Sequence, residues 1–239
     1  MRRAMGLSIN SISAKLMKQL GPAKIAEFAH KCGITSPLNE VPSLCLGASE
    51  VSLLDQVTGY STMVNGGEKT DPILVLKITD KVGTVLREFS AIEKAAIKPE
   101  TAYLMTYMLQ GAVHEPGGTA EGLKRTSIVA GNEIGAKTGT TSNYSDGWFM
   151  GVTQKIVAGV WVGGDDRSIH FRNLALGQGA KMAMPVYAKF MERVYSDATL
   201  AIEGYRKMPF LKPDNFTFDF TCSGKVGQDS LAISQQPVN

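Results

Sequence analysis

The stretch Ile134–Gly163, with the sequence IGAKTGTTSNYSDGWFMGVTQKIVAGVWVG, decides the fold. It contains three apolar runs, Ile134–Thr141, Gly147–Thr153 and Lys155–Gly163, which are separated by tight polar turns. Valine, isoleucine and aromatic residues in short runs of this kind favour β-strands. Consecutive strands joined by so few residues pair antiparallel, so the stretch predicts a three-stranded antiparallel sheet.

Helical spacing of apolar residues dominates the chain before this sheet. It predicts helices over residues 3–20, 23–32, 52–64 (capped by Ser49 or Ser52) and 99–113, with a β-hairpin over 72–79 and 85–89. One closing helix is predicted over 183–195, and the chain after Lys212 is expected to fray. This order of elements indicates an α+β domain, with helices first, then an antiparallel sheet and one closing helix.

The composition excludes several classes of protein. With 239 residues, 44% of them hydrophobic, the chain is globular, and a net charge of +3 spread along it argues against nucleic-acid binding. The longest apolar run, Ile156–Val162, is too short to span a bilayer. The three cysteines and three histidines lack metal-ligand spacing, so we expect no metal and no cofactor. A Cys32–Cys45 disulfide is one alternative, and free thiols are favoured over it.

The segment Lys137-Thr138-Gly139-Thr140-Thr141 at the start of this sheet is the strongest candidate for a binding site. A glycine within a strand lets the backbone of a ligand approach closely and even pair as an added strand. Two threonine hydroxyls flank that glycine and a lysine adds positive charge. The combination suits the anionic end of a peptide lying along a sheet edge. A plain strand that ends in a glycine turn is the alternative.

A second segment, Ser8-Ile9-Asn10, lies in a part of the chain predicted to be helical. Alone it means little, because serine and asparagine are common at helix N-caps. Together with a later Lys-Thr-Gly-Thr on a strand, its order resembles that of the penicillin-recognising serine enzymes. The three motifs of those enzymes are Ser-x-x-Lys, Ser-x-Asn and Lys-Thr-Gly.

Flanking segments narrow the resemblance to the transpeptidase domain of class A penicillin-binding proteins. These segments are Leu46–Ser52, Tyr60–Gly67, Gly117–Ala120, Gly135–Asn143, Asp146–Gly151 and Val160–Asp166. The resemblance covers about residues 1–205. It implies an α+β fold of the penicillin-binding protein and β-lactamase type. We expect a partial transpeptidase domain in residues 1–211 and a C-terminal tail in residues 212–239.

The chain departs from the family at the nucleophile. In the family the nucleophile is the serine of Ser-x-x-Lys, but no serine of this sequence has a lysine three positions later. We therefore expect the chain to be the C-terminal part of such a domain, incapable of acylation by itself. The nucleophile helix, the first strands of the family's five-stranded sheet, the glycosyltransferase domain and the membrane anchor would lie upstream.

The resemblance implies an acyl transfer from the D-Ala-D-Ala end of a peptidoglycan stem peptide. Carried over to this sequence, Ser8 relays a proton to the leaving group. Asn10 holds the substrate amide and the missing lysine, and Lys137 holds the hydroxyl of Ser8. These three residues are the expected catalytic set.

The resemblance also implies which residues bind the substrate. Thr138 and Thr140 bind its terminal carboxylate, and the backbone N–H of Thr140 forms half of an oxyanion hole, with Gly139 and Thr141 completing the segment. The expected partners are D-Ala-D-Ala stem peptides and β-lactam antibiotics. Membrane contact is expected only through the upstream anchor, at the extracytoplasmic (periplasmic) face of the bacterial cytoplasmic membrane.

Two other functions stay open at the level of sequence. One is a serine β-lactamase or D,D-carboxypeptidase, which would share the sheet and the motifs. The other is a non-catalytic module that binds peptidoglycan or β-lactams. Among single residues, we expect Trp148 to pack in the core rather than line a cleft. Asp165-Asp166 is interpreted as a turn rather than an acid–base pair.

Overall fold

The computed structural model describes residues 1–220. Within them the α-helices are α1 (Arg2–Gly6), α2 (Asn10–Leu20), α3 (Pro22–Lys31), α4 (Leu53–Val64), α5 (Pro99–Leu109), α6 (Gly111–His114), α7 (Leu174–Gly177), α8 (Gly179–Met182), α9 (Met184–Ser196) and α10 (Ala198–Ile202). The strands are β1 (Glu68–Thr70), β2 (Lys77–Thr79), β3 (Val85–Glu88), β4 (Glu93–Ala95), β5 (Gly135–Thr140), β6 (Asp146–Val152) and β7 (Val157–Gly163). Two short 3-10 segments are η1 (Pro42–Leu46) and η2 (Glu121–Arg125). The predicted α+β class is confirmed.

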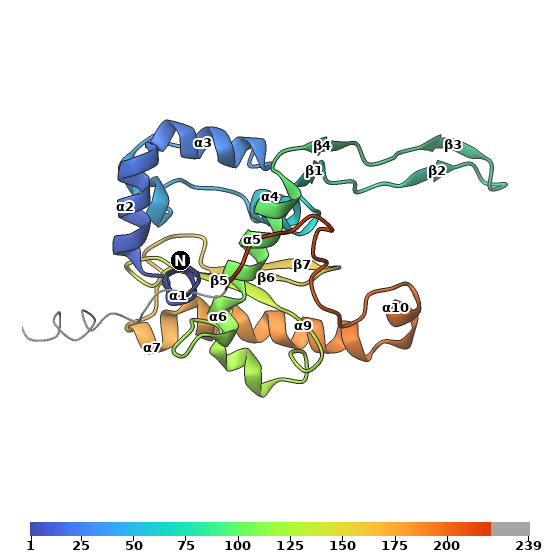
Figure 1. Ribbon diagram of the computed structural model, residues 1–239. Helices are drawn as coiled ribbons and strands as arrows, with labels where there is room; N and C mark the ends of the chain where they lie inside the picture. The colour runs from blue at the N-terminus through green and yellow to red at the C-terminus, as the bar shows by residue number, and fades with distance from the viewer. Residues whose placement is uncertain (221–239) are drawn as a thin grey trace, which may run out of the picture.

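The central sheet has the order β5-β6-β7, and both of its pairs are antiparallel, as predicted. Helices cover both of its faces (Figure 1). On one face Phe149 packs 4.9 Å from the ring of Tyr187 on α9, and both side chains are fully buried. On the other face Val152 packs with Leu109 of α5 and with Phe210 from the C-terminal segment. The sheet is therefore the middle layer between α4 and α5 on one side and α8 and α9 on the other.

The predicted helix over residues 3–20 is wrong as one element, because it is broken into α1 and α2 at Ser8. Ser8 has a backbone φ of 54°, in the left-handed region that ends a right-handed helix. The N–H of Ile9 bonds to the carbonyl of Ala4 at 2.9 Å and closes α1. Apolar spacing continues across the break, which is why periodicity alone did not reveal it.

The helix predicted over residues 52–64 is confirmed as α4. Its cap is Ser52 rather than Ser49, since the Ser52 hydroxyl accepts the N–H of Asp55 at 3.0 Å. The predicted helix at 99–113 forms α5 and α6, and the predicted closing helix forms α9. Helix α10 follows it and was not predicted.

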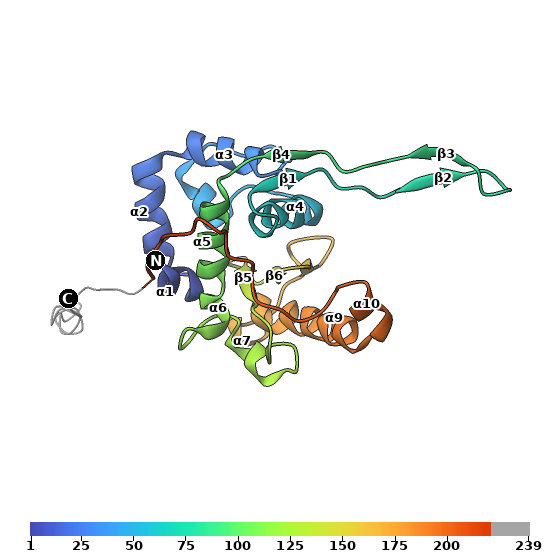
Figure 2. The ribbon, with the colours of Figure 1, turned by 45° about the vertical axis from the view of Figure 1, so that its right-hand side comes forward.

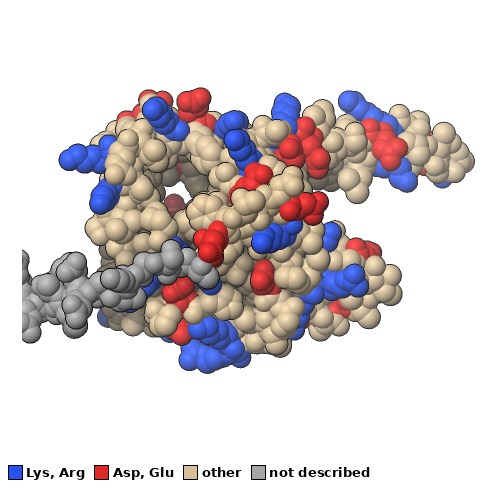
Figure 3. All heavy atoms as spheres, in the orientation of Figure 1, with Lys and Arg blue, Asp and Glu red and all other residues tan. Residues whose placement is uncertain are grey.

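The predicted hairpin forms a projecting arm of β2 and β3, joined to the body through β1 and β4 (Figures 1 and 2). Both strands of the hairpin are shorter than predicted, and the β1–β4 pair was missed. At the tip, the carboxylate of Asp80 accepts the N–H groups of Val82 at 2.9 Å and Thr84 at 2.8 Å. Over the body and the arm, basic and acidic side chains are interspersed on the face shown in Figure 3.

The C-terminal segment differs from the expectation of fraying after Lys212. Phe216 is only 8% exposed and packs on Tyr103 of α5, with ring centroids 4.9 Å apart. Cys32 and Cys45 are free thiols, and Cys222 lies outside the described residues. In residues 1–220 no helix has the length and apolar character that crossing a bilayer requires.

Asp55 anchors the loop after α3 to the first turn of α4. Its carboxylate is buried and accepts the hydroxyl of Thr35 at 2.8 Å, the N–H of Ser36 at 2.8 Å and the Ser36 hydroxyl. Burial alone would raise the pKa of this carboxyl, but the hydrogen bonds from Ser36 and Thr35 outweigh it and hold the pKa below its ordinary value. The network therefore stabilises the folded chain in its ionised form.

We predict that Asp55→Asn lowers the free energy of unfolding by about 1–3 kcal/mol at pH 7, because an amide cannot accept all three donors. Since the folded-state pKa is lowered, the contribution of Asp55 is present above the unfolded pKa of about 3.9 and disappears as the pH falls through the folded pKa. The difference in free energy of unfolding between wild type and variant should therefore become smaller in acid. Urea unfolding at pH 7 and pH 3 measures this difference. Asp214→Asn, at an exposed position, is the control. An equal gap at both pH values would contradict this account.

Candidate functional site

Lys137 and Ser8 meet across the fold. Lys137 lies on β5, and its Nζ donates to the Ser8 Oγ at 2.8 Å and to the carbonyl oxygen of Thr138 at 2.6 Å. Ser8 lies in the left-handed turn between α1 and α2. Because the Ser8 oxygen accepts from Lys137, the hydroxyl proton of Ser8 is directed elsewhere. This geometry leaves Ser8 able to donate a proton to a third group.

Lys137 is half-buried. Burial lowers the pKa of its ammonium below the ordinary value of lysine, because a desolvated charge is disfavoured. A proton on Lys137 is therefore given up more readily than one on a surface lysine. Together with the contact to Ser8, this makes the pair suitable for moving a proton.

Close packing of α1 on α6 places the Ser8 turn. A methyl group on Gly6 would lie 2.5 Å from the carbonyl carbon and oxygen of Gly111, and one on Gly111 would lie 2.7 Å from the carbonyl oxygen of Arg2. The N–H of Thr119 also donates to the carbonyl of Gly6 at 3.0 Å. The backbones of α1 and α6 can approach so closely only because both positions are glycine.

The strand register separates the residues of the Lys-Thr-Gly-Thr segment into two faces. Lys137 lies opposite Met150 and Gly139 lies opposite Trp148, so both share the α4 and α5 face of the sheet. A methyl group on Gly139 would lie 3.1 Å from the Trp148 Cβ. Trp148 is half-buried, so the expectation that it packs in the core is wrong.

Thr138 and Thr140 point toward the face of α8 and α9. The Oγ1 of Thr140 accepts the N–H of Gly179 at 3.1 Å, which still leaves the hydroxyl proton free to bind an anion. Gly179 was missed as a site residue, because nothing in the sequence around it indicates a contact with Thr140. A methyl group on Gly179 would lie 2.4 Å from the carbonyl oxygen of Trp148.

The outer edge of β5 is open among the described residues, where β5 pairs only with β6. The N–H of Thr141 bonds across the ladder to the carbonyl of Asp146 at 3.2 Å. Ladder bonds alternate along an antiparallel strand, so the N–H groups of Thr138 and Thr140 point away from β6. A peptide lying along this edge would find the Thr140 N–H and the Lys137 ammonium beside it.

The other residues predicted for the site, Asn10 and Thr141, are not hydrogen-bonded to the Lys137–Ser8 pair in the described part of the chain. Asn10 is exposed at the start of α2, and no hydrogen bond joins it to Ser8 or Lys137. The Thr141 hydroxyl accepts the N–H groups of Ser145 at 3.1 Å and Asp146 at 3.0 Å, so it closes the turn after β5. Asp166 accepts the N–H of Ser168 at 2.8 Å, as the turn interpretation of Asp165-Asp166 requires. In residues 1–220 no three acidic, histidine or cysteine side chains converge in a way that would hold a metal ion.

Comparisons with known proteins show the family to which this chain belongs. Residues 1–192 match the family described as the penicillin binding protein transpeptidase domain, and the chain belongs to that family. It is 31% identical over 229 residues to penicillin-binding protein 1A of Aquifex aeolicus. The alignment covers 94% of this chain and 30% of that protein. The chain thus spans about a third of the length of such relatives.

Two solved structures have the same fold. Penicillin-binding protein 1A from Haemophilus influenzae superposes with a TM-score of 0.74 at 25% identity, over 82% of this chain and 34% of that one. PonA1 from Mycobacterium tuberculosis, solved in complex with penicillin V, superposes with a TM-score of 0.72 at 24% identity, over 89% of this chain and 59% of that one.

We predict that Gly6→Ala lowers the free energy of unfolding by about 1–3 kcal/mol, because the added methyl group pushes α1 off α6. Gly122→Ala is the matched control, since its methyl group would meet the flexible ends of the Met184 and Arg125 side chains rather than backbone. Urea unfolding of both variants measures the difference. A Gly6→Ala variant as stable as Gly122→Ala would mean that the α1–α6 contact is not tight.

Proposed function

We propose that this chain is part of a D,D-transpeptidase that cross-links peptidoglycan. The observation that carries the proposal is the hydrogen bond from Lys137 to Ser8, beside the open edge of β5, in a chain of this family. The substrate class is the D-Ala-D-Ala end of a stem peptide, with β-lactams as mimics. The place of action is the extracytoplasmic face of a bacterial cytoplasmic membrane. The domain comprises residues 1–211, and the packing of Phe216 supports its extension into residues 212–220.

In the proposed reaction, the serine of a Ser-x-x-Lys segment attacks the carbonyl carbon of the penultimate D-Ala, and the lysine of that segment takes up the proton of the serine hydroxyl. An ester forms, the amide C–N bond breaks, and the departing amine takes up the proton of Ser8. Lys137 then returns a proton to Ser8, a transfer that its lowered pKa favours, and the proton removed from the attacking serine replaces the one that Lys137 gave up. The amine of a neighbouring stem peptide next attacks the ester, which forms the cross-link and releases the serine.

The sheet edge supplies the electrostatic part of the proposed reaction. The outward N–H of Thr140 is placed to bind the carbonyl oxygen as it becomes negative, and one such donor contributes about 2.7–4 kcal/mol to the transition state. The hydroxyls of Thr138 and Thr140 are the proposed ligands of the terminal carboxylate. The role first expected for Asn10, binding of the substrate amide, stays a proposal and requires its exposed side chain to turn toward the peptide.

The mass of the intact protein after incubation with a penicillin tests the proposal. We predict no adduct on the 239-residue chain and one adduct on a longer product of the same gene that includes a Ser-x-x-Lys segment. In that longer product, Ser8→Ala should slow acylation by about 10²–10⁴-fold, the usual contribution of general acid–base catalysis. Ser11→Ala, an exposed position on α2, is the control and should acylate like wild type.

Two results would overturn the proposal. An adduct on the 239-residue chain would reveal a nucleophile other than the serine of Ser-x-x-Lys. A longer product that binds penicillin without any adduct would favour the non-catalytic binding module.

A further inference from the structure

The last described part of the chain, Met208–Phe220, forms a strap along α5 (Figure 2). Side chains of the body accept its backbone N–H groups at three places: Met208 bonds to Asn132 Oδ1 at 3.1 Å, Phe210 to Glu133 Oε2 at 2.8 Å and Leu211 to Gln154 Oε1 at 2.7 Å. Phe210 is buried against the face of the sheet that α5 covers. The strap is thus fixed at its start.

The end of the strap carries three phenylalanines at alternate positions. Phe216 packs edge-on against Tyr103, and Phe220 stacks on Tyr107 with centroids 3.8 Å apart, whereas Phe218 is 62% exposed. Tyr103 and Tyr107 lie one turn apart on α5, so they present adjacent rings on one side of that helix. The strap contacts this aromatic pair with its first and third phenylalanines.

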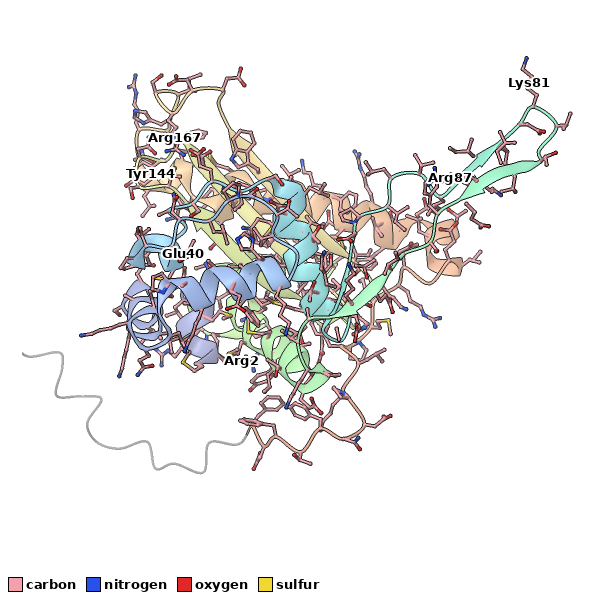
Figure 4. All side chains as sticks on the ribbon, turned by 90° about the horizontal axis from the view of Figure 1, so that it is seen from above. Arg2, Glu40, Lys81, Arg87, Tyr144 and Arg167 are labelled. Carbon is pink, nitrogen blue, oxygen red and sulfur yellow. The ribbon has the colours of Figure 1, made fainter. Side chains whose placement is uncertain are left out.

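Tyr107 also contacts α1. The guanidinium carbon of Arg2 lies 4.4 Å from the centroid of the Tyr107 ring, and the Arg2 Nε lies 3.5 Å from a carboxylate oxygen of Glu115. Figure 4 shows Arg2 beside α5. Arg2 begins α1, and Ser8 follows the end of that helix. Arg2 therefore links α1 to Tyr107 of α5 and to Glu115, the residue that follows α6.

Helix α1 spans only Arg2–Gly6, which is too short to hold its conformation without tertiary contacts. Met5 packs on the apolar cluster of Leu109, Val152 and Phe210. The other contacts of α1 lie at two places, the glycine packing at Gly6 and the Arg2 contacts with Tyr107 and Glu115. The first sets how closely α1 approaches α6. The Arg2 contacts restrain the rotation of α1 about the Gly6 contact. Ser8 follows directly after α1, so its position depends on that rotation.

We infer that the strap positions the proton-relay serine: Phe220 holds the ring of Tyr107 against Arg2, and Arg2 holds α1 so that Ser8 stays on Lys137. The inference rests on the proposed function for its catalytic consequence. Phe220, Tyr107 and Arg2 are positioning residues that act through α1.

The first test measures the ammonium of Lys137 in the 239-residue chain by NMR of lysines labelled with ¹³C at the ε-carbon. In wild type its titration midpoint should lie below that of surface lysines, because the group is buried. In Phe220→Leu and Arg2→Leu, water reaches Lys137, so the midpoint should rise toward the ordinary lysine value. Phe218→Leu is the matched control and should titrate like wild type.

Conservative variants separate positioning from simple loss of stability. Tyr107→Phe keeps the ring and Arg2→Lys keeps the charge, so both should titrate close to wild type. If Phe220→Leu and Arg2→Leu lower the melting temperature while the Lys137 titration stays unchanged, the strap is only structural and the inference is wrong.

The second test measures penicillin acylation in the longer gene product. Phe220→Leu should slow it about tenfold to a hundredfold, the effect of misplacing a reacting group by about 1 Å, and Phe218→Leu should not slow it. If Ser8→Ala leaves acylation unchanged, the proposed function fails. If Ser8→Ala slows acylation while Phe220→Leu changes neither the rate nor the Lys137 titration, only the strap inference fails.

Discussion

The hydrogen bond between Lys137 and Ser8 is the contact on which the site depends. It joins the edge strand of the central sheet to a turn near the start of the chain, and each side is held by its own packing. Lys137 is fixed by the ladder between β5 and β6, while Ser8 is fixed by α1. The partly buried ammonium of Lys137 is satisfied by the Ser8 oxygen and by the carbonyl of Thr138, and the hydroxyl proton of Ser8 is directed elsewhere as a result. In the proposed function, the same bond serves both the stability of the fold and the chemistry.

Glycines set the distances around this bond. At Gly6 and Gly111 two helix backbones touch, and at Gly179 the start of α8 touches the backbone of the sheet. At Gly151 the ring of Tyr187 fills the space where a side chain would stand. Each is a place where the addition of one methyl group must move an element that carries the site. The sheet is therefore held on its α8 and α9 face, and α1 is held on α6, by contacts that tolerate no extra atom.

Much of this arrangement could be predicted from the sequence, because it follows from local patterns. Alternating apolar runs gave the sheet, and the Ser-x-Asn and Lys-Thr-Gly-Thr segments led to Ser8 and Lys137. What could not be predicted depends on contacts between distant segments. The left-handed backbone of Ser8 and the bond from Gly179 to Thr140 leave no periodic signal. The aromatic run after Lys212 was expected to fray, because nothing in its own sequence indicates that it packs on Tyr103 and Tyr107, which lie one turn apart on α5.

The most direct measurement of the central claim is a double-mutant cycle on Ser8 and Lys137, read as the rate of penicillin acylation in the longer gene product. Lys137→Met removes the charge while keeping the length of the side chain, and Ser8→Ala removes the hydroxyl. If the two residues act as one unit, the double variant should be no slower than the slower single variant. If the two rate losses multiply, Ser8 and Lys137 act independently and the account of a shared proton path is wrong.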